Sequence, residues 1–142
     1  MQKFLPSLFI CIFLFISCNE SLEKKIIGKW ALEFEDNDFA IKDNGEIAPR
    51  NSLVFQFNED GTGTYVIMTF SSPTKYKKTD ILPLDDSAFV WHFEGNKLII
   101  RSTTDKWKPI TDTFFVSFSS ENSCTMENKE MQGPPTRYYK LK

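Results

Sequence analysis

From residue 26 onward, large apolar side chains recur at every second position rather than at helical spacing. Such period-two alternation indicates strands with one buried face and one solvent-facing side. In residues 89–93, for example, Phe, Trp and Phe alternate with Val and His. The pattern predicts eight strands, at residues 27–35, 52–58, 62–70, 87–93, 97–103, 112–118, 123–128 and 136–141. No long amphipathic helix pattern interrupts them.

The links between these predicted strands define the expected architecture. Residues 58–61, 94–96 and 119–122 carry the Asn, Asp, Gly and Ser typical of tight turns. Short links make sequential strands antiparallel neighbours. We therefore expect an all-β fold, a small up-and-down antiparallel β-barrel of about eight strands, because closure removes exposed edges. A β-sandwich remains the alternative. The three long links, at 36–51, 71–86 and 129–135, are expected to serve as lids or binding loops.

The first residues have a different pattern. Lys3 is the only charge in residues 1–17, and residues 4–16 are almost wholly apolar. This matches the apolar core of a signal peptide and is too short for a membrane-spanning helix. Ser17 followed by Cys18 resembles the lipobox of bacterial lipoproteins, in which cleavage precedes a Cys that then carries lipid. Cys11 follows bulky Ile10 and is a poor cleavage site.

The lipobox resemblance divides the chain into a signal peptide at 1–17, a short tether at 18–25 and a barrel domain at 26–142. Acyl chains such as palmitate on Cys18, at about 0.8 kcal/mol per buried CH₂, would hold the protein on a lipid bilayer. The expected location is the bacterial cell envelope, at the outer membrane, facing the periplasm or the cell surface. An ordinary secretory signal is the alternative. Cys124 would remain alone and could form no intramolecular disulfide.

Charge and motif content narrow the function classes. The net charge of −2 and the pI near 5.5 argue against nucleic-acid binding, which needs a basic surface. His92 is the only histidine, and its alternation with Trp91 and Phe93 points it to the outer wall. No phosphate-binding loop, Gly-x-Ser-x-Gly or Cys-x-x-Cys motif occurs. We therefore expect no catalytic site, no metal site and no cofactor.

A Gly-x-Trp motif, Gly28-Lys29-Trp30, opens the predicted barrel. With the strand order and the terminal Tyr138-Tyr139 pair, it resembles the lipocalins, and specifically the lipocalin-like lipoproteins of Bacteroidetes-type bacteria. This resemblance implies that Gly28 and Trp30 close one end of the barrel, with a basic residue of the last strand packed on the indole. Arg137 is expected to be that residue.

Two functions follow from these expectations. In the first, the barrel binds a small apolar ligand in a cup lined by inward-facing side chains. The expected lining residues are Phe55, Phe57, Tyr65, Ile67, Phe89, Trp91, Phe93, Phe114 and Val116. In the second, large side chains fill the barrel, and the protein is a structural or interaction protein that docks on another envelope protein. Eight-stranded barrels are compatible with either interior.

Overall fold

A computed structural model describes residues 20–35, 38–78, 88–103 and 111–142. This part contains one short helix, α1 (Leu22–Ile26), and nine strands. The strands are β1 (Gly28–Leu32), β2 (Arg50–Phe57), β3 (Thr62–Ser72), β4 (Lys75–Lys78), β5 (Ala88–Glu94), β6 (Lys97–Ser102), β7 (Thr111–Ser120), β8 (Ser123–Glu127) and β9 (Thr136–Lys140).

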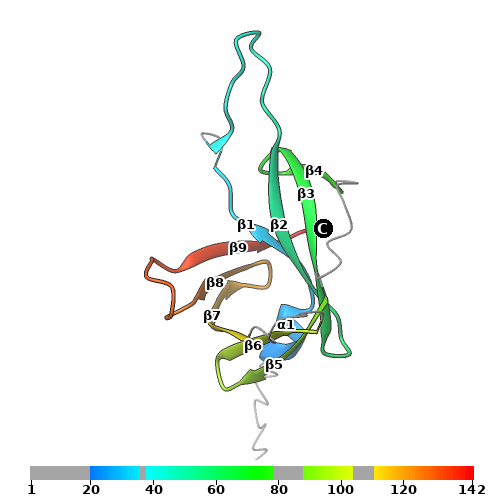
Figure 1. Cartoon of the computed structure of the whole chain (residues 1–142), viewed down its shortest axis with the longest axis vertical. Coiled ribbons are helices and arrows are strands. Elements are labelled where there is room, and N and C mark those ends of the chain that lie inside the picture. The colour runs from blue at the N-terminus through cyan, green and yellow to red at the C-terminus, as the bar shows by residue number, and fades with distance from the viewer. Residues whose placement is uncertain (1–19, 36–37, 79–87, 104–110) are drawn as a thin grey trace, which may run out of the picture.

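Eight of the strands form a closed antiparallel barrel (Figure 1). Around its wall the order is β1-β2-β3-β5-β6-β7-β8-β9, and β9 pairs with β1 to close the ring. The closing register aligns Trp30 with Lys140 and Leu32 with Tyr138. The expected up-and-down barrel is confirmed, and the sandwich alternative is not formed.

Two elements differ from the sequence prediction. The first predicted strand is too long, since β1 ends at Leu32 and leaves Phe34 outside the barrel ladder. The link predicted at 71–86 contains β4, which pairs with the distal half of β3. Tyr76 explains this strand, because its ring packs on Phe70 at 5.5 Å between centroids. The helix α1 begins within the predicted tether, where Ser21 caps its first turn, and ends at Ile26, the first residue of the predicted barrel domain.

The inner core lies inside the barrel and comes from alternate positions of every wall strand. Its buried members are Ile26, Trp30, Phe55, Phe57, Phe89, Trp91, Leu98, Ile100, Val116, Cys124 and Met126. Aromatic rings dominate it and meet mostly edge to face, the arrangement that their quadrupoles favour. The predicted alternation therefore correctly assigned the interior face of the sheet.

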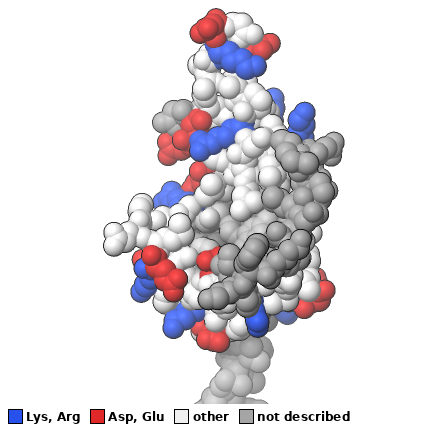
Figure 2. Space-filling view, viewed as in Figure 1, with Lys and Arg blue, Asp and Glu red and all other residues white. Residues whose placement is uncertain are grey.

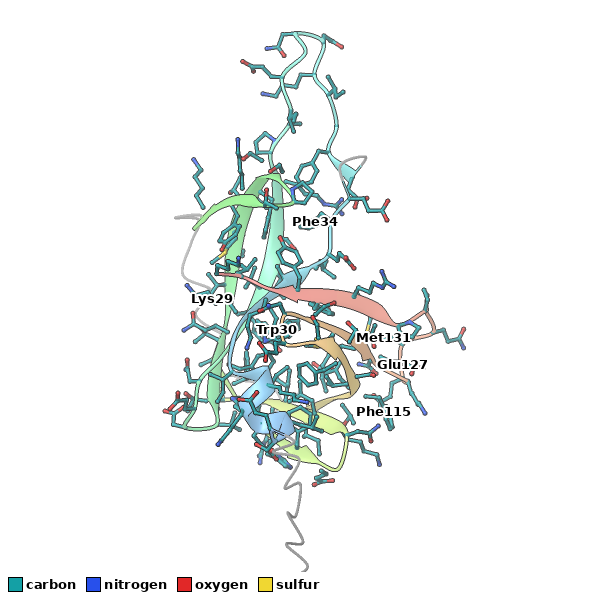
Figure 3. All side chains as sticks on the ribbon, turned by 180° about the vertical axis from the view of Figure 1, so that it is seen from behind. Lys29, Trp30, Phe34, Phe115, Glu127 and Met131 are labelled. Carbon is teal, nitrogen blue, oxygen red and sulfur yellow. The ribbon has the colours of Figure 1, made fainter. Side chains whose placement is uncertain are left out.

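An outer core covers the other face of β1, β2 and β3. Its buried members are Ala31, Phe34, Phe39, Val54, Met68, Phe70 and Leu141. Phe34 packs edge to face on both Phe39 and Phe70, with centroids 5.8 and 5.2 Å apart. Seen from behind, Phe34 lies toward the base of the long hairpin, above the level of Trp30 (Figure 3). Three wall strands are thus buried on both sides.

A long hairpin, residues 40–48, projects from the barrel between β1 and β2 (Figure 1). Ile41 and Ile47 form an isolated antiparallel bridge in it, and Ala48 N–H donates to Ala40 O at 2.8 Å. Its tip is charged in the space-filling view, and Lys42 pairs with Glu46 at 3.7 Å (Figure 2). Ile41 is 74% exposed and Ile47 is 50% exposed. The hairpin and α1 lie at opposite ends of the barrel (Figure 1).

Within the described ranges, no helix has both the length and the apolar character needed to cross a membrane.

Candidate functional site

The end of the barrel next to α1 is closed by Trp30 and Lys140. The Trp30 ring is fully buried, and its Nε1–H donates to the Ile26 carbonyl at 2.6 Å. Lys140 Nζ lies 5.2 Å from the centroid of the Trp30 ring and donates to the Lys25 carbonyl at 3.0 Å. Both contacts tie the last turn of α1 to the barrel, where a cation also complements the helix C-terminus.

Gly28 is required at this closed end for two reasons. Its φ of +124° is a backbone conformation that L side chains rarely adopt. A Cβ there would also lie 3.3 Å from Lys140 Cε. The spacing of the Gly-x-Trp motif therefore has a local physical cause, because the glycine leaves room for the cation that covers the tryptophan two residues later.

The expected contact between Arg137 and Trp30 is wrong. Arg137 has a side chain 73% exposed, and its Nη1 lies 3.7 Å from Glu33 Oε2 on the outside of the barrel. The β9 residues on the inner face are Thr136, Tyr138 and Lys140, since Tyr138 packs on the inner core and Lys140 lies on Trp30. Arg137 has the opposite parity along the strand, so alternation places it outside.

An aromatic layer crosses the middle of the barrel. The Phe55 ring from β2 lies 6.3 Å from Phe114 of β7, on the opposite wall, and 5.7 Å from Tyr138 of β9. It also lies 5.3 Å from Tyr65 and 6.5 Å from Phe89. Rings that meet across a barrel fill it at that level. Any room for a ligand therefore lies above Phe55, away from the closed end.

The predicted lining residues divide between core and rim. Five of them, Phe55, Phe57, Phe89, Trp91 and Val116, are buried members of the inner core. Tyr65, Phe93 and Phe114 are half-buried and pack against it. Ile67 lies on β3 opposite Leu53 of β2, one inward step above the pair Phe55 and Tyr65. Trp91 lies deep, and its Nε1–H donates to the Thr62 carbonyl at 2.8 Å.

We define the mouth as the inward-facing positions above Phe55: Leu53, Ile67, Asp112, Thr136 and the hydroxyl ends of Tyr65 and Tyr138. Leu53 shares the inward face with Phe55 and Phe57, yet it is 43% exposed. Asp112 shares a face with Phe114, is half-buried, and pairs with Ile100 of the inner core. The mouth thus combines exposed apolar side chains with a carboxylate.

Burial changes the ionisation of the mouth phenols. Desolvation raises the pKa of Tyr65, and the nearby negative charge of Asp112 raises it further. Desolvation also raises the pKa of Tyr138. The predicted set of lining residues contained neither Asp112, Tyr138 nor Leu53. Each of them lies on the same inward face of its strand as predicted lining or core residues. A preference for apolar residues explains the omission of Asp112, whereas Leu53 and Tyr138 are apolar or aromatic like the predicted lining and could have been included.

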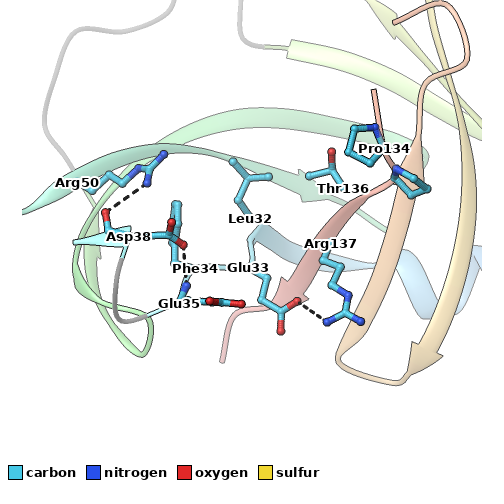
Figure 4. A pocket seen from close by; sticks show the side chains of 10 residues that line it. Leu32, Glu33, Phe34, Glu35, Asp38, Arg50, Pro134, Thr136 and Arg137 are labelled. Atoms are coloured by element: carbon cyan, nitrogen blue, oxygen red, sulfur yellow. Dashed lines mark hydrogen bonds and ion pairs between the residues drawn. The ribbon is translucent and has the colours of Figure 1, made fainter. Parts of the chain in front are cut away.

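A groove of about 500 Å³ lies beside the mouth, between the end of β1 and the start of β9 (Figure 4). Arg50 Nη1 donates to the Asp38 carbonyl at 3.4 Å, and its guanidinium lies 4.9 Å from the Phe34 ring centroid. The second guanidinium, of Arg137, pairs with Glu33. Both arginine side chains in the groove already have protein partners, and acidic side chains line the same groove. The groove therefore does not present the excess of one charge that would bind an ionic ligand.

The remaining predicted groups lie elsewhere. Cys18 and the predicted signal peptide lie outside the described residues. His92 is exposed on the outer wall, with Nε2 3.3 Å from Glu94 Oε1. Cys124 is buried in the inner core, and burial raises the pKa of its thiol to about 12. In the described ranges, no three His, Cys, Asp or Glu side chains come together in a way that could hold a metal ion.

Comparisons with family models, curated proteins and solved structures found no match to this chain.

Proposed function

We propose that this protein is an envelope lipoprotein, anchored through an acylated Cys18, whose lipocalin-like barrel binds a small apolar or amphipathic ligand at its mouth. One observation carries the ligand proposal: the two barrel ends differ. The end next to α1 is sealed by Trp30 and Lys140, while the opposite end keeps inward-facing Leu53 43% exposed. Exposed apolar surface inside a concave rim is the usual character of a small-molecule site.

The aromatic layer limits the size of that ligand. Phe55 and Phe114 meet across the barrel, so the ligand would rest on this layer rather than pass through it. A body of one or two rings, or a short alkyl chain, suits such a shallow site. The expected lining residues in contact with it reduce to Ile67, Tyr65, Phe55 and Phe114, joined by Leu53.

A matched pair of substitutions tests the mouth. The probe is the neutral dye N-phenyl-1-naphthylamine, whose fluorescence rises in apolar surroundings. We expect saturable binding near 1:1, lost in Leu53→Glu and retained in Val90→Glu. Val90 is also an exposed strand residue, 40% exposed, but it has outward parity on β5. Equal loss in both variants, or no saturable binding by the folded wild type, would contradict the ligand proposal.

The anchor has its own test. Expressed in a bacterial host, the wild-type chain is expected in the membrane fraction with an acyl mass shift on Cys18. Cys18→Ala should abolish that shift and leave an uncleaved precursor or release the protein from the membrane. Cys11→Ala serves as the control and should change neither property. Unmodified Cys18 in the mature wild-type protein would refute the anchor.

A second candidate function, docking on another envelope protein, is favoured by the projecting hairpin. Ile41 and Ile47 are exposed on it, and it rises from the end of the barrel opposite α1 (Figure 1). With an anchor at Cys18, shortly before α1, the hairpin would point away from the membrane. A photo-crosslinker at position 41 should then yield one discrete adduct in intact envelopes. The same group at Asn96, in the turn near α1, should not. Identical patterns from both positions would exclude specific docking by the hairpin.

A further inference from the structure

Three polar groups of the mouth have no protein partner among the described residues. The Asp112 carboxylate has no ion pair and accepts no hydrogen bond from a described side chain. The hydroxyls of Tyr65 and Tyr138 also lack a described partner, whereas Tyr76 and Tyr139 donate to carbonyls at 2.8 and 2.7 Å. Buried polar groups are normally hydrogen-bonded, so partly buried groups without a described protein partner are available to water or to a ligand.

These groups surround one aromatic floor. Phe55 contacts Tyr65 on β3, Tyr138 on β9 and Phe114 on β7, with ring centroids between 5.3 and 6.3 Å apart. Asp112 lies one inward step above Phe114 on β7. Asp112 shares the inner face of β7 with Phe114, and the rings of Tyr65 and Tyr138 both contact Phe55, so these three polar residues come from three strands that surround the Phe55 ring. The raised pKa of Tyr65, caused partly by Asp112, agrees with this proximity.

The chain itself brings no cation to this space within the described residues. Among inward-facing positions of the wall strands, Lys140 carries the one positive charge, and it is held at the closed end by Trp30 and the Lys25 carbonyl. Arg101, beside Asp112 on the neighbouring strand, pairs in register with Thr111 and has outward parity. Arg137 pairs with Glu33 outside the barrel. Among the described residues, Asp112 thus has no cation beside it at a partly apolar mouth.

From this geometry we infer that the ligand of the mouth carries an ammonium group on its small apolar or aromatic body. The N–H groups of the cation would donate to the Asp112 carboxylate and to the phenol oxygens of Tyr65 and Tyr138. The π faces of the same tyrosines, with Phe114, would attract the positive charge, and Phe55 would support the apolar body. This inference rests on the proposed ligand-binding function and specifies its chemical class.

Three probes that share one naphthyl body test the charge preference. They are 2-naphthylmethylamine, cationic at pH 7; 2-naphthylmethanol, neutral; and 2-naphthoate, anionic. Their dissociation constants are measured by calorimetry on the mature protein. We expect the amine to bind at least about tenfold more tightly than the alcohol, the scale of a charge-assisted hydrogen bond. The acid should bind most weakly.

Asp112→Asn removes the charge and keeps the shape of the side chain. It should lower the affinity for the amine to that for the alcohol, while the affinity for the alcohol stays within about twofold. Glu127→Gln, a half-buried acid with outward parity on the adjacent strand, is the matched control and should change neither value. Thermal unfolding monitored by tryptophan fluorescence confirms that both variants fold.

The outcomes separate this inference from the proposed function. Preference for the amine that Asp112→Asn abolishes supports both. Equal affinities for the amine and the alcohol overturn the charge inference and leave the apolar site intact. A preference for the amine that persists in Asp112→Asn has the same meaning. Absence of saturable binding by any of the three probes, together with absence of dye binding, overturns the ligand-binding function itself. The three-probe comparison on the wild type decides the question even if a variant fails to fold.

Discussion

Phe55 and Phe114 stand on diametrically opposed strands of an eight-stranded barrel, with ring centroids 6.3 Å apart. Since three wall strands separate β2 from β7 on either side, this contact spans the full width of the interior. Small barrels of this strand number are just wide enough for side chains to fill them. The contact therefore separates the end of the barrel that Trp30 and Lys140 close from the opposite end.

The first prediction concerns this aromatic layer. Phe55→Ala should lower the free energy of unfolding by about 3–5 kcal/mol, because it opens a cavity among five ring neighbours. Phe115→Ala is the control, since Phe115 is half-buried on the outer wall beneath Lys129, with 4.2 Å between the ammonium and the ring centroid. It should cost about 1 kcal/mol. Urea unfolding measures both, and equal losses would contradict a layer centred on Phe55.

The second prediction concerns the closed end. Gly28→Ala should destabilise the protein by about 1–3 kcal/mol, because a Cβ is strained at φ +124° and crowds Lys140. Gly133→Ala provides the comparison, since a Cβ there meets nothing within 4 Å. Its effect should stay within about 0.5 kcal/mol. Thermal melts of the two variants decide the matter, and a neutral Gly28→Ala would argue against this backbone geometry.

The third prediction separates the two basic residues of β9. Lys140→Met removes the bond to the Lys25 carbonyl and the cation above Trp30, and should cost about 1–3 kcal/mol. Arg137→Met removes only an exposed pair with Glu33, worth at most about 1 kcal/mol. Denaturant titration of both variants gives the comparison. A larger loss from Arg137→Met would restore the arginine as the residue that closes the barrel.

The fourth prediction concerns pH. The folded thiol of Cys124 has a pKa of about 12, above the ordinary value of 9.0, because burial disfavours the thiolate. The unfolded state therefore releases this proton at lower pH than the folded state. Stability is fully present below pH 9 and falls between pH 9 and 12, by about 1.4 kcal/mol per pH unit for one proton.

Unfolding experiments across that window test the sign. Tyr139 adds to the decline above pH 10, since its pKa is also raised to about 12 by burial. Cys124→Ala should flatten the curve most clearly just above pH 9, where tyrosines with an ordinary pKa of 10.0 are still mostly protonated in both states. A chromogenic disulfide reagent at pH 8 should label Cys124 only after unfolding. Rapid labelling of the native protein would contradict its burial.

Most of the barrel could be predicted from alternation alone, because each wall strand has one face in the inner core. The errors arose where a second apolar surface was present. Phe34 continues the alternation of Trp30 and Leu32, yet it packs in the outer core beyond the end of β1. The sequence pattern cannot distinguish one core from two, since both favour the same residue types. The strand around Tyr76 was not predicted because the flanking lysines make this segment look like an exposed polar link.

The candidate site was predicted less completely than the fold. Aromatic content identified the floor of the mouth, but the surroundings of Asp112 and Lys140 depend on registers between distant strands. The alternation of side chains along β9 could be read from the sequence, and it favours Lys140 over Arg137 as the basic residue that packs on Trp30. Whether a cation lies beside Asp112 depends on how distant strands pair, so the local sequence pattern could not show that the described residues place none there.

The pairing of β1 with β9 also sets the order in which the protein can be completed. A ribosome delivers Trp30 long before Lys140, and every earlier hairpin can form while these two residues are still apart. Joining them is the most non-local step and carries the largest loop-closure cost, so closure of the ring is expected last. Until then, the edges of β1 and β8 lie unpaired and can template association with other chains. The nascent protein is thus most vulnerable to aggregation in the interval before its final strand emerges.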